Sequence, residues 1–283
     1  MAINEHRGCL ICRSGKYETV FTYDKPDRYE RAVGIGSAGY WRKWVRCMDC
    51  GFYYSLYSRR DDAIDRLYAF TYRSEASSWR ENNVEDVFER IISLPPEKSE
   101  TKCRVQWIKS QLELLWASGM VEKGSPPYRL LDIGGATGVM AYEFRDHEWR
   151  TQIIDPSEQG TFVQTKYGIP YVKDYYKPGC FEEPFELITL CYVVEHLRDP
   201  VSFLKLIRAD MRPHSLVFLE VPDAAHFTHR SQEDDIFNSC HLWMFSPGTL
   251  IALLDLCGFE AFSMVRTKTV RGIHSLMVIG GLK

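Results

Sequence analysis

From residue 129 onward, short apolar runs alternate along the chain with segments whose apolar residues recur at spacings of three and four. The first pattern predicts buried strands, and the second predicts helices packed on them. The predicted strands cover 129–133, 150–154, 170–172, 186–191 and 215–221, and the predicted helices cover 138–146, 157–167 and 200–210. Because such alternation is typical of a parallel sheet, the fold class is α/β.

The end of the chain departs from this alternation. An apolar helix is predicted from Thr249 to Cys257, and strands are predicted at 259–269 and 273–282. Only the short turn Val270-Arg-Gly separates the two strands, so they should pair antiparallel. We therefore expect an antiparallel hairpin to close an otherwise parallel sheet.

The part before residue 129 divides into two further regions. Residues 1–60 carry paired cysteines and many aromatic side chains, whereas 61–120 is predicted to be helical and is followed by a Gly/Pro-rich linker. Two sets of apolar positions mark the helices: Val84, Val87, Phe88, Ile91 and Ile92, then Val105, Ile108, Leu112 and Leu115. We expect an N-terminal lobe at 1–60, a helical connector or lid at 61–120, and a core domain at 121–283.

Among nine cysteines, Cys9 with Cys12 and Cys47 with Cys50 form two Cys-x-x-Cys pairs. Two such turns supply the four thiolates of a tetrahedral structural Zn²⁺ site. Zinc binding contributes on the order of 10 kcal/mol of folding free energy in small modules, which suits a lobe this small. Redox-active pairs and buried free thiols are the alternatives. The other five cysteines are expected to act as small apolar side chains.

A turn of small residues follows the first predicted core strand, which ends near Asp132. Gly134 and Gly138 allow the backbone to approach a ligand, and the helix after the turn offers unpaired N–H groups. Asp155 closes the next strand and can accept hydrogen bonds from both hydroxyls of a ribose. These features predict a nucleoside site at the carboxyl ends of the strands.

The glycine pattern required for a dinucleotide is incomplete. A Gly-x-Gly-x-x-Gly fingerprint starting at Gly134 would need glycine at 136 and glycine or alanine at 139, whereas the chain has Ala136 and Val139. A nucleoside without a diphosphate is therefore the better prediction, and a nicotinamide oxidoreductase is disfavoured.

The turn Asp132-Ile-Gly-Gly-Ala-Thr-Gly resembles the first motif of class I S-adenosylmethionine (SAM) methyltransferases. Segments 153–157, 185–200 and 241–250 resemble the end of the family's second strand, its fourth-strand motif and a later element. The resemblance covers roughly residues 105 to 283. It implies a Rossmann-like core with a mostly parallel seven-stranded sheet and a terminal antiparallel hairpin, SAM as the cofactor, and methyl transfer as the activity.

The resemblance also implies a set of cofactor-binding residues. They are Asp132, Gly134, Gly135, Gly138, Asp155, Pro156, Asp174 and Cys191. Asp155 is expected to hold the ribose, Asp174 to contact adenine, and Cys191 to line the methyl-donor pocket. The structural alternatives are a turn carboxylate for Asp132, a helix N-cap for Asp155 and an exposed loop residue for Asp174.

The candidate catalytic residues are His241, Tyr192 and His196. In sugar C-methyltransferases that this region resembles, a Glu-His pair contributes the general base. Here Cys240 stands where the glutamate would be, so His241 matches and its partner does not. For His196, hydrogen bonds that hold its loop are the structural alternative. A metal bound by His226, His229, Asp234 and Asp235 is a further alternative.

A lobe with two Cys-x-x-Cys pairs joined to a SAM core resembles enzymes that methylate nucleotide-linked sugars or related natural-product and polysaccharide precursors. The expected partner is such a small molecule, methylated on carbon, oxygen or nitrogen. Aromatic and cationic residues at 29–46 would suit a nucleotide sugar, and packing within the lobe is their alternative role. The competing functions are an RNA-modifying methyltransferase and a non-catalytic interaction protein.

Charge and hydropathy narrow these choices. A net charge of −3 and a pI near 6.3 give no overall attraction to nucleic acid, so nucleic acid is not an expected partner. No apolar run approaches the roughly 18 residues of a membrane span, and the N-terminus lacks the apolar core of a signal peptide. We expect a cytoplasmic protein without a membrane partner, and make no prediction of its oligomeric state.

Overall fold

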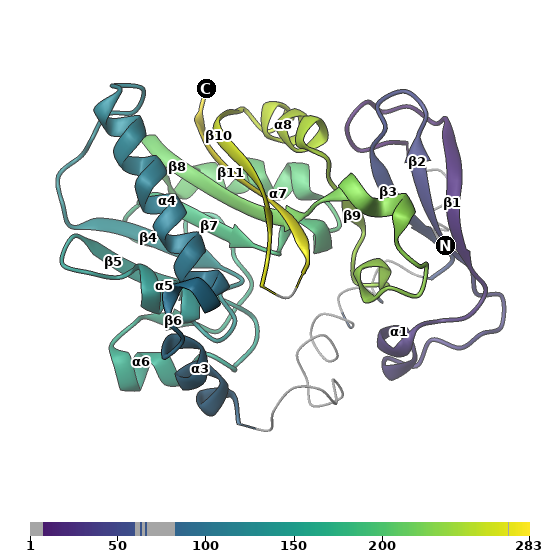
Figure 1. Ribbon diagram of the computed structural model, residues 1–283, viewed down its shortest axis with the longest axis horizontal. Helices are drawn as coiled ribbons and strands as arrows, with labels where there is room; N and C mark the ends of the chain where they lie inside the picture. The colour runs from purple at the N-terminus through teal and green to yellow at the C-terminus, as the bar shows by residue number, and fades with distance from the viewer. Residues whose placement is uncertain (1–7, 60–62, 64–65, 67–82, 271) are drawn as a thin grey trace.

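Two sheets organise the computed structural model, which describes residues 8–59, 63, 66, 83–270 and 272–283 (Figure 1). The larger sheet has the order β10-β11-β8-β7-β4-β5-β6. Its strands are β4 Tyr128–Ile133, β5 Trp149–Ile154, β6 Tyr171–Val172, β7 Phe185–Cys191, β8 Met211–Pro222, β10 Phe259–Lys268 and β11 His274–Leu282. Strands β4 to β8 pair in parallel, whereas β11 is antiparallel to both β8 and β10. The predicted seven-stranded sheet and its closing hairpin are confirmed.

Four of the six α-helices in this part of the chain begin after residues whose side chains cap them. They are α3 Val84–Ile92, α4 Glu100–Ala117, α5 Val139–Phe144, α6 Phe162–Tyr167, α7 Pro200–Leu206 and α8 Pro247–Leu256, and the short helices η3 Pro96–Lys98 and η5 Ile207–Asp210 lie beside α4 and α7. The side chains of Asn83, Ser99, Asp199 and Ser246 accept hydrogen bonds from first-turn N–H groups of α3, α4, α7 and α8.

Helix α6 begins at Phe162 rather than at the predicted residue 157. The intervening segment is held against the turn that follows β4. The Oη of Tyr171 donates to Ser157 O at 2.9 Å and lies 3.2 Å from Ala136 O. A Cβ at Gly160 would lie only 2.2 Å from Ala136 O. These contacts take the first part of the predicted helix out of helical geometry.

The two faces of the larger sheet bury alternate residues of each strand. In β4, Leu130 packs with α4 and Leu131 packs with the cluster that contains α7 and α8. In β7, Leu187 and Ile188 divide between the same two clusters. This period of two places helices on both faces and leaves the strand ends to build a site.

A four-stranded antiparallel sheet forms the N-terminal lobe. Its strands are β1 Tyr17–Tyr23, β2 Arg42–Cys47, β3 Tyr53–Tyr57 and β9 Trp243–Met244, in the order β1-β2-β3-β9, with helix α1 Arg28–Ala32 after β1. Strand β9 belongs to the connection between β8 and α8, which also contains η6 Ala224–His229 and η7 Asp235–Phe237. The connection between β8 and α8 therefore completes the sheet of the N-terminal lobe (Figure 1).

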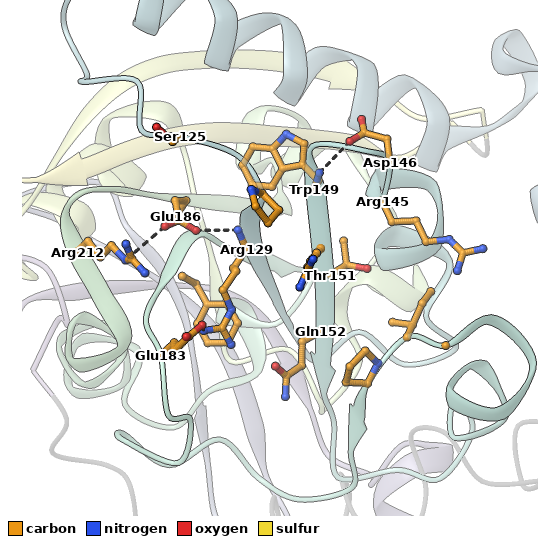
Figure 2. A pocket seen from close by; sticks show the side chains of 16 residues that line it. Ser125, Arg129, Arg145, Asp146, Trp149, Thr151, Gln152, Glu183, Glu186 and Arg212 are labelled. Carbon is orange, nitrogen blue, oxygen red and sulfur yellow. Dashed lines mark hydrogen bonds and ion pairs between the residues drawn. The ribbon is translucent and has the colours of Figure 1, made fainter.

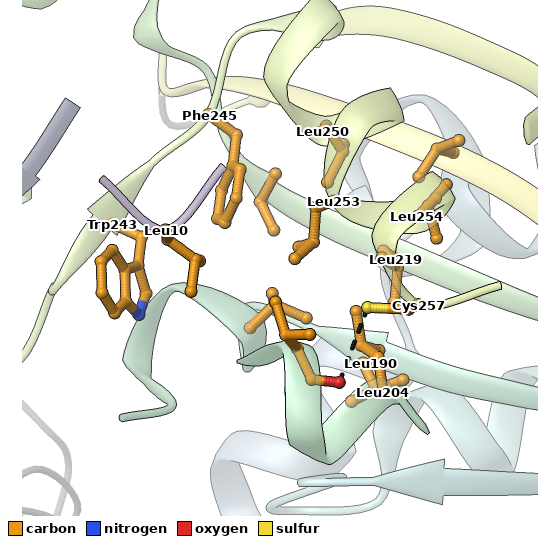
Figure 3. Packing of buried hydrophobic residues seen from close by; sticks show 14 of the residues in the cluster. Leu10, Leu190, Leu204, Leu219, Trp243, Phe245, Leu250, Leu253, Leu254 and Cys257 are labelled. Atoms are coloured by element: carbon orange, nitrogen blue, oxygen red, sulfur yellow. Dashed lines mark hydrogen bonds between the residues drawn. The ribbon is translucent and has the colours of Figure 1, made fainter. Parts of the chain in front are cut away.

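The lobe and the larger sheet share one hydrophobic cluster. Leu10 lies beside Trp243 and Phe245, and α8 adds Leu250 and Leu253 to the same group (Figure 3).

The three-part division at 1–60, 61–120 and 121–283 stays a prediction. In the connector, 61–62, 64–65 and 67–82 lie outside the described residues. Over the described part of the chain, no helix combines the length and apolarity needed to cross a membrane.

Candidate cofactor, catalytic and metal sites

The four lobe cysteines meet between the loop before β1 and the turn that joins β2 to β3. The Sγ atoms of Cys9 and Cys50 are 3.4 Å apart, as are those of Cys12 and Cys47, and all four lie within 4.8 Å of one another. A disulfide would require about 2.05 Å. Sulfurs each about 2.3 Å from a tetrahedral ion stand roughly 3.8 Å apart. The cluster thus fits the predicted Zn²⁺ ligands in chemistry and spacing.

The two Cys-x-x-Cys turns share one geometry. The residue after each pair, Arg13 or Gly51, has a left-handed backbone with φ of 63° or 74°. Its N–H donates to the carbonyl of the first cysteine, at 2.9 Å for Cys9 and 3.0 Å for Cys47. A left-handed conformation is unfavourable for arginine, so this matched turn indicates a constraint imposed by the cluster.

A cavity of about 240 Å³ opens at the carboxyl ends of β4 and β7. Five predicted residues line it: Asp132, Gly134, Gly135, Cys191 and Tyr192. Five others were not predicted: Thr101, Ala136, Thr137, Val139 and Met140. The cavity lies where open α/β sheets bind their ligands.

Glycine is required at two positions of the turn. Gly134 has φ of 73°, and a Cβ there would lie 2.7 Å from Val193 Cγ2. A Cβ at Gly135 would lie 2.7 Å from Asp132 Oδ2. The buried Asp132 carboxylate accepts a 2.7 Å hydrogen bond from Thr189 Oγ1, which orients it at the end of β4. Side chains at either glycine would displace the turn or the carboxylate.

Asp155 is fully buried and hydrogen-bonded to the glycine turn. Its Oδ2 accepts from Ala136 N at 2.9 Å, and its Oδ1 accepts from Ser157 N at 2.8 Å and Ser157 Oγ at 2.6 Å. Because Ala136 lines the cavity and has φ of 49°, Asp155 fixes the shape of that wall. Its predicted contact with ribose stays a prediction.

The other predicted cofactor residues have different surroundings. Gly138 is the N-cap residue of α5 and has φ of 82°, and a Cβ there would lie 3.0 Å from Ile153 Cδ1. The exposed Asp174 pairs with Lys177 Nζ at 2.6 Å. Pro156 is half-buried. The structure therefore gives Gly138 a packing role, and cofactor contacts by these three residues stay predictions.

Tyr192 combines a strained backbone with a fixed ring. Its φ is 54°, its N–H donates to Glu220 O at 2.8 Å, and its Oη is hydrogen-bonded to Ser275 Oγ. Burial, followed by the charge of Glu220, raises the pKa of the Tyr192 phenol. The Glu220 carboxylate pairs with the buried Arg104 on α4, one turn after Thr101. No sequence motif marks this contribution of α4 to the site.

His196 and His241 lie together with Glu195, the residue that precedes His196 in η4 Val194–His196. The two imidazole rings have centroids 4.7 Å apart, and all three side chains are buried. Burial lowers the pKa of His241 below its usual value. Cys191, a wall of the cavity, is the last residue of β7, and Glu195 follows it by four residues. Glu195 and His196 therefore lie on the segment that leaves the cavity end of β7.

The N-terminal lobe holds the segment that carries His241. Arg42 Nη1 donates to Phe237 O at 2.6 Å, and Arg59 Nη2 donates to Ser239 O at 2.6 Å. Both guanidinium groups are buried. Two charged side chains of the lobe thus position the backbone just before His241.

Most of the aromatic and cationic residues predicted for a nucleotide sugar serve the lobe itself. Trp44 is completely buried, and Tyr40 donates to Glu30 Oε2 at 2.6 Å. Arg46 pairs with Glu18 at 3.1 Å on the lobe surface. These partners favour the packing alternative for the set.

A larger cavity, of about 880 Å³, lies at the amino ends of strands β4, β5, β7 and β8, on the side of the larger sheet away from the glycine turn. Glu186 bridges Arg129 N at 2.7 Å and Arg212 Nε at 3.3 Å on its border (Figure 2). Size does not make it the better cofactor site, because nucleoside ligands of open α/β sheets bind at the carboxyl ends. Glu186 is thus remote from the glycine turn.

Comparisons with known proteins agree with this geometry. A sequence model of the family described as "Methyltransferase domain" matches residues 79–263. A 1,6-didemethyltoxoflavin-N1-methyltransferase from Burkholderia thailandensis, solved with S-adenosylhomocysteine, has a TM-score of 0.50 and 16% identity over 71% of this chain and 87% of its own. The N-methyltransferase NodS from Bradyrhizobium japonicum WM9 has a TM-score of 0.47 and 14% identity over 71% and 99%. No curated protein matches the sequence. The chain belongs to the methyltransferase-domain family and has the fold of class I SAM-dependent methyltransferases.

Proposed function

We propose that this protein transfers the methyl group of SAM to a small molecule of the class of nucleotide-linked sugars or related natural-product and polysaccharide precursors. The observation that carries the proposal is the cavity at the carboxyl ends of β4 and β7, shaped by Gly134, Gly135 and Asp132. This position is the one at which a class I fold holds its nucleoside.

The cofactor half of the proposal rests on the turn. Gly134 and Gly135 bring the backbone close to the ligand, and Asp132 presents a carboxylate that Thr189 holds in place. Asp155, through Ala136, keeps the turn in the shape that admits a ribose. Cys191 and Tyr192 close the cavity at the end of β7.

Bound SAM supplies a methyl group already activated on a sulfonium. The protein then needs to align the acceptor and assist the loss of its proton. Alignment can contribute roughly 7–11 kcal/mol of barrier reduction, and a general base adds about 10²–10⁴ in rate. We assign the assistance to His241 and His196, with Tyr192 as a wall of the acceptor path.

A small acceptor is favoured over RNA because lobe cations are engaged internally. Arg42 and Arg59 are buried against backbone carbonyls, and Arg46 faces Glu18. Few contacts with phosphates are therefore available from these residues, and counterion release would be small. The similar enzyme from Burkholderia thailandensis was solved with 1,6-didemethyltoxoflavin bound.

Calorimetry with S-adenosylhomocysteine and with NAD tests the cofactor assignment. We expect one S-adenosylhomocysteine per chain and no heat from NAD. Binding of NAD in preference to S-adenosylhomocysteine would remove the basis for methyl transfer.

The acceptor is tested by incubating the protein with isotopically labelled SAM and pools of nucleotide sugars, followed by mass spectrometry. A labelled nucleotide sugar is the expected product. Label in RNA and not in the sugar pool would contradict the proposed acceptor class.

A further inference from the structure

A second group of potential metal ligands lies outside the cysteine cluster. A carboxylate oxygen of Glu195 and ring nitrogens of His196 and His241 lie within 4.8 Å of one another. We propose that these three side chains bind a divalent transition-metal ion, distinct from the ion of the four cysteines. The proposal rests on the proposed function and deepens it: with Nε2 of both rings on the ion, the ion and not a free imidazole would assist the loss of the acceptor's proton.

Backbone carbonyls fix the tautomers of both histidines. His196 Nδ1 lies 3.0 Å from Cys240 O, and His241 Nδ1 lies 2.6 Å from Ile236 O. Since a carbonyl oxygen only accepts, each Nδ1 must carry the hydrogen and donate it. In a neutral ring, Nε2 is then left with a lone pair. Metal-binding histidines use this arrangement, in which the second nitrogen donates to a carbonyl or a carboxylate.

Glu195 has a carboxyl group suited to the same ion. Its side chain is fully buried, and neither oxygen has a hydrogen-bond partner within the described part of the chain. A buried carboxylate without a partner is costly, and a cation removes that cost. Among the described residues, His196 Nε2 lies 3.8 Å from Glu195 Oε1, which is beyond hydrogen-bond length.

The separation of 3.8 Å suits two ligands of one ion. Donors each about 2.1 Å from a metal can stand up to roughly 4.2 Å apart. A pair at the outer limit of 4.8 Å would have to close by about 0.6 Å, which side-chain rotation can supply.

The chemistry of the donors selects the ion. Two imidazoles and one carboxylate, without a thiolate, suit Mn²⁺, Fe²⁺, Co²⁺ or Zn²⁺, whereas four thiolates retain Zn²⁺. Glu195 follows Cys191, the last residue of β7, by four residues, so the ion would lie on the segment that leaves that end of the strand. A divalent ion makes a coordinated acceptor hydroxyl more acidic.

The lobe makes this site rigid. The carbonyls that orient the two rings belong to Ile236 and Cys240, and Arg42 and Arg59 bind the carbonyls of Phe237 and Ser239 between them. A ligand set fixed in this way loses little conformational freedom when it binds an ion.

Titration of the purified full chain with Mn²⁺, followed by the electron paramagnetic resonance of free Mn²⁺, tests the inference. Mn²⁺ is chosen because it does not displace zinc from thiolates. We expect one Mn²⁺ per chain in the wild type, and affinity at least about tenfold weaker in Glu195→Gln and His241→Gln. His214→Asn is the matched control, because His214 pairs with Glu122 at 3.0 Å on the surface, and it should bind Mn²⁺ as the wild type does.

A wild-type protein that binds no Mn²⁺, and that holds no more Co²⁺ or Zn²⁺ than the cysteine cluster accounts for, would overturn the inference. Equal Mn²⁺ affinity in Glu195→Gln and the wild type would do the same. These wild-type measurements decide the matter even where a variant does not fold. Calorimetry with S-adenosylhomocysteine on the same sample separates the two proposals: cofactor binding without a second ion removes only the metal site, and a second ion without cofactor binding removes only the methyltransferase assignment.

Discussion

At the residue scale, Gly134 and Gly179 share a left-handed backbone but not an environment. Their φ values are 73° and 72°, yet a Cβ at Gly134 would lie 2.7 Å from Val193 Cγ2, and one at Gly179 would meet nothing within 4 Å. Both alanine variants incur about 1–2 kcal/mol of backbone strain. We expect Gly134→Ala also to weaken S-adenosylhomocysteine binding by about tenfold or more, as measured by calorimetry.

Gly179→Ala is the control for strain alone and should keep wild-type affinity. If both variants lost affinity equally, the turn after β4 would have no special place in cofactor binding. In urea unfolding, both variants should lose the free energy of the backbone strain. Gly134→Ala should lose more than Gly179→Ala, because its new Cβ also clashes with Val193.

Cys257 allows a second prediction at this scale. Burial raises its pKa to about 12, and it is fully buried below α8 (Figure 3). At pH 8 iodoacetamide should label the exposed Cys103 and Cys180 and spare Cys257 until the protein unfolds. Because the unfolded thiol loses its proton near pH 9 and the folded thiol near 12, this group lowers stability as pH rises through that window. Rapid labelling of Cys257 at pH 8, detected by peptide mass spectrometry, would contradict its place in the core.

The sequence was sufficient to predict the residues of the glycine turn, because strand, turn and helix are consecutive there. It did not indicate that the Asp155 carboxylate accepts hydrogen bonds from Ala136 and Ser157, and the contact of Asp155 with ribose stays a prediction. Thr101, which lines the cavity, and Arg104, which pairs with Glu220, were also missed, since only the tertiary packing of α4 places them there.

At the scale of elements, α1 is fastened to the rest of the molecule by a buried ion pair. Glu30 and Arg59 are both buried and paired, whereas Glu18 and Arg46 form an exposed pair at 3.1 Å. Removing one partner of a buried pair leaves an uncompensated charge and costs about 3–5 kcal/mol. An exposed pair contributes about 0–1 kcal/mol.

We therefore expect Glu30→Gln to lower the free energy of unfolding by about 3–5 kcal/mol and Glu18→Gln to change it by less than about 1 kcal/mol. Urea denaturation followed by tryptophan fluorescence measures both. A loss in Glu30→Gln no larger than in Glu18→Gln would show that the buried network does not hold the lobe.

Most helices and strands followed from the period of their apolar residues. Strand β9 did not, because its pairing with β3 is set by segments far apart in the chain. The late start of α6 was missed for a similar reason, since contacts of Ser157 and Gly160 with distant residues override helix propensity.

At the scale of the whole molecule, the cysteine cluster should support both sheets. Cys9 and Cys47 belong to the hydrophobic cluster that includes α7 and α8. We expect Cys12→Ser to lose one zinc per chain and to lower the melting temperature by several degrees or more, because metal binding in small modules contributes folding free energy. Elemental analysis and thermal melts measure the two effects.

Cys180→Ser is the control, because Cys180 is exposed and lies outside the cluster. It should keep its zinc and its melting temperature. Full zinc content in Cys12→Ser would show that the four cysteines do not form the metal site.

The arrangement of the whole chain was predicted in outline, with the core fold confirmed and the division into three regions still a prediction. What the sequence could not indicate is that residues 243–244 leave the core to join the lobe. The composition of each region suggests that the lobe and the core are separate units. In the structure, strand β9 from the core region forms part of the sheet of the lobe.

The sheet of the N-terminal lobe takes its last strand, β9, from the core region of the chain. The lobe therefore cannot be completed during synthesis until Met244 has been added. Strand β3 leaves the ribosome long before β9, and at about 5–20 residues per second the interval is on the order of ten seconds or more. Throughout that time one edge of the nascent N-terminal sheet has no neighbour and is open to pairing with other chains. We expect a truncated product ending before Trp243 to aggregate, so stalled translation of this chain would generate insoluble protein rather than a usable lobe.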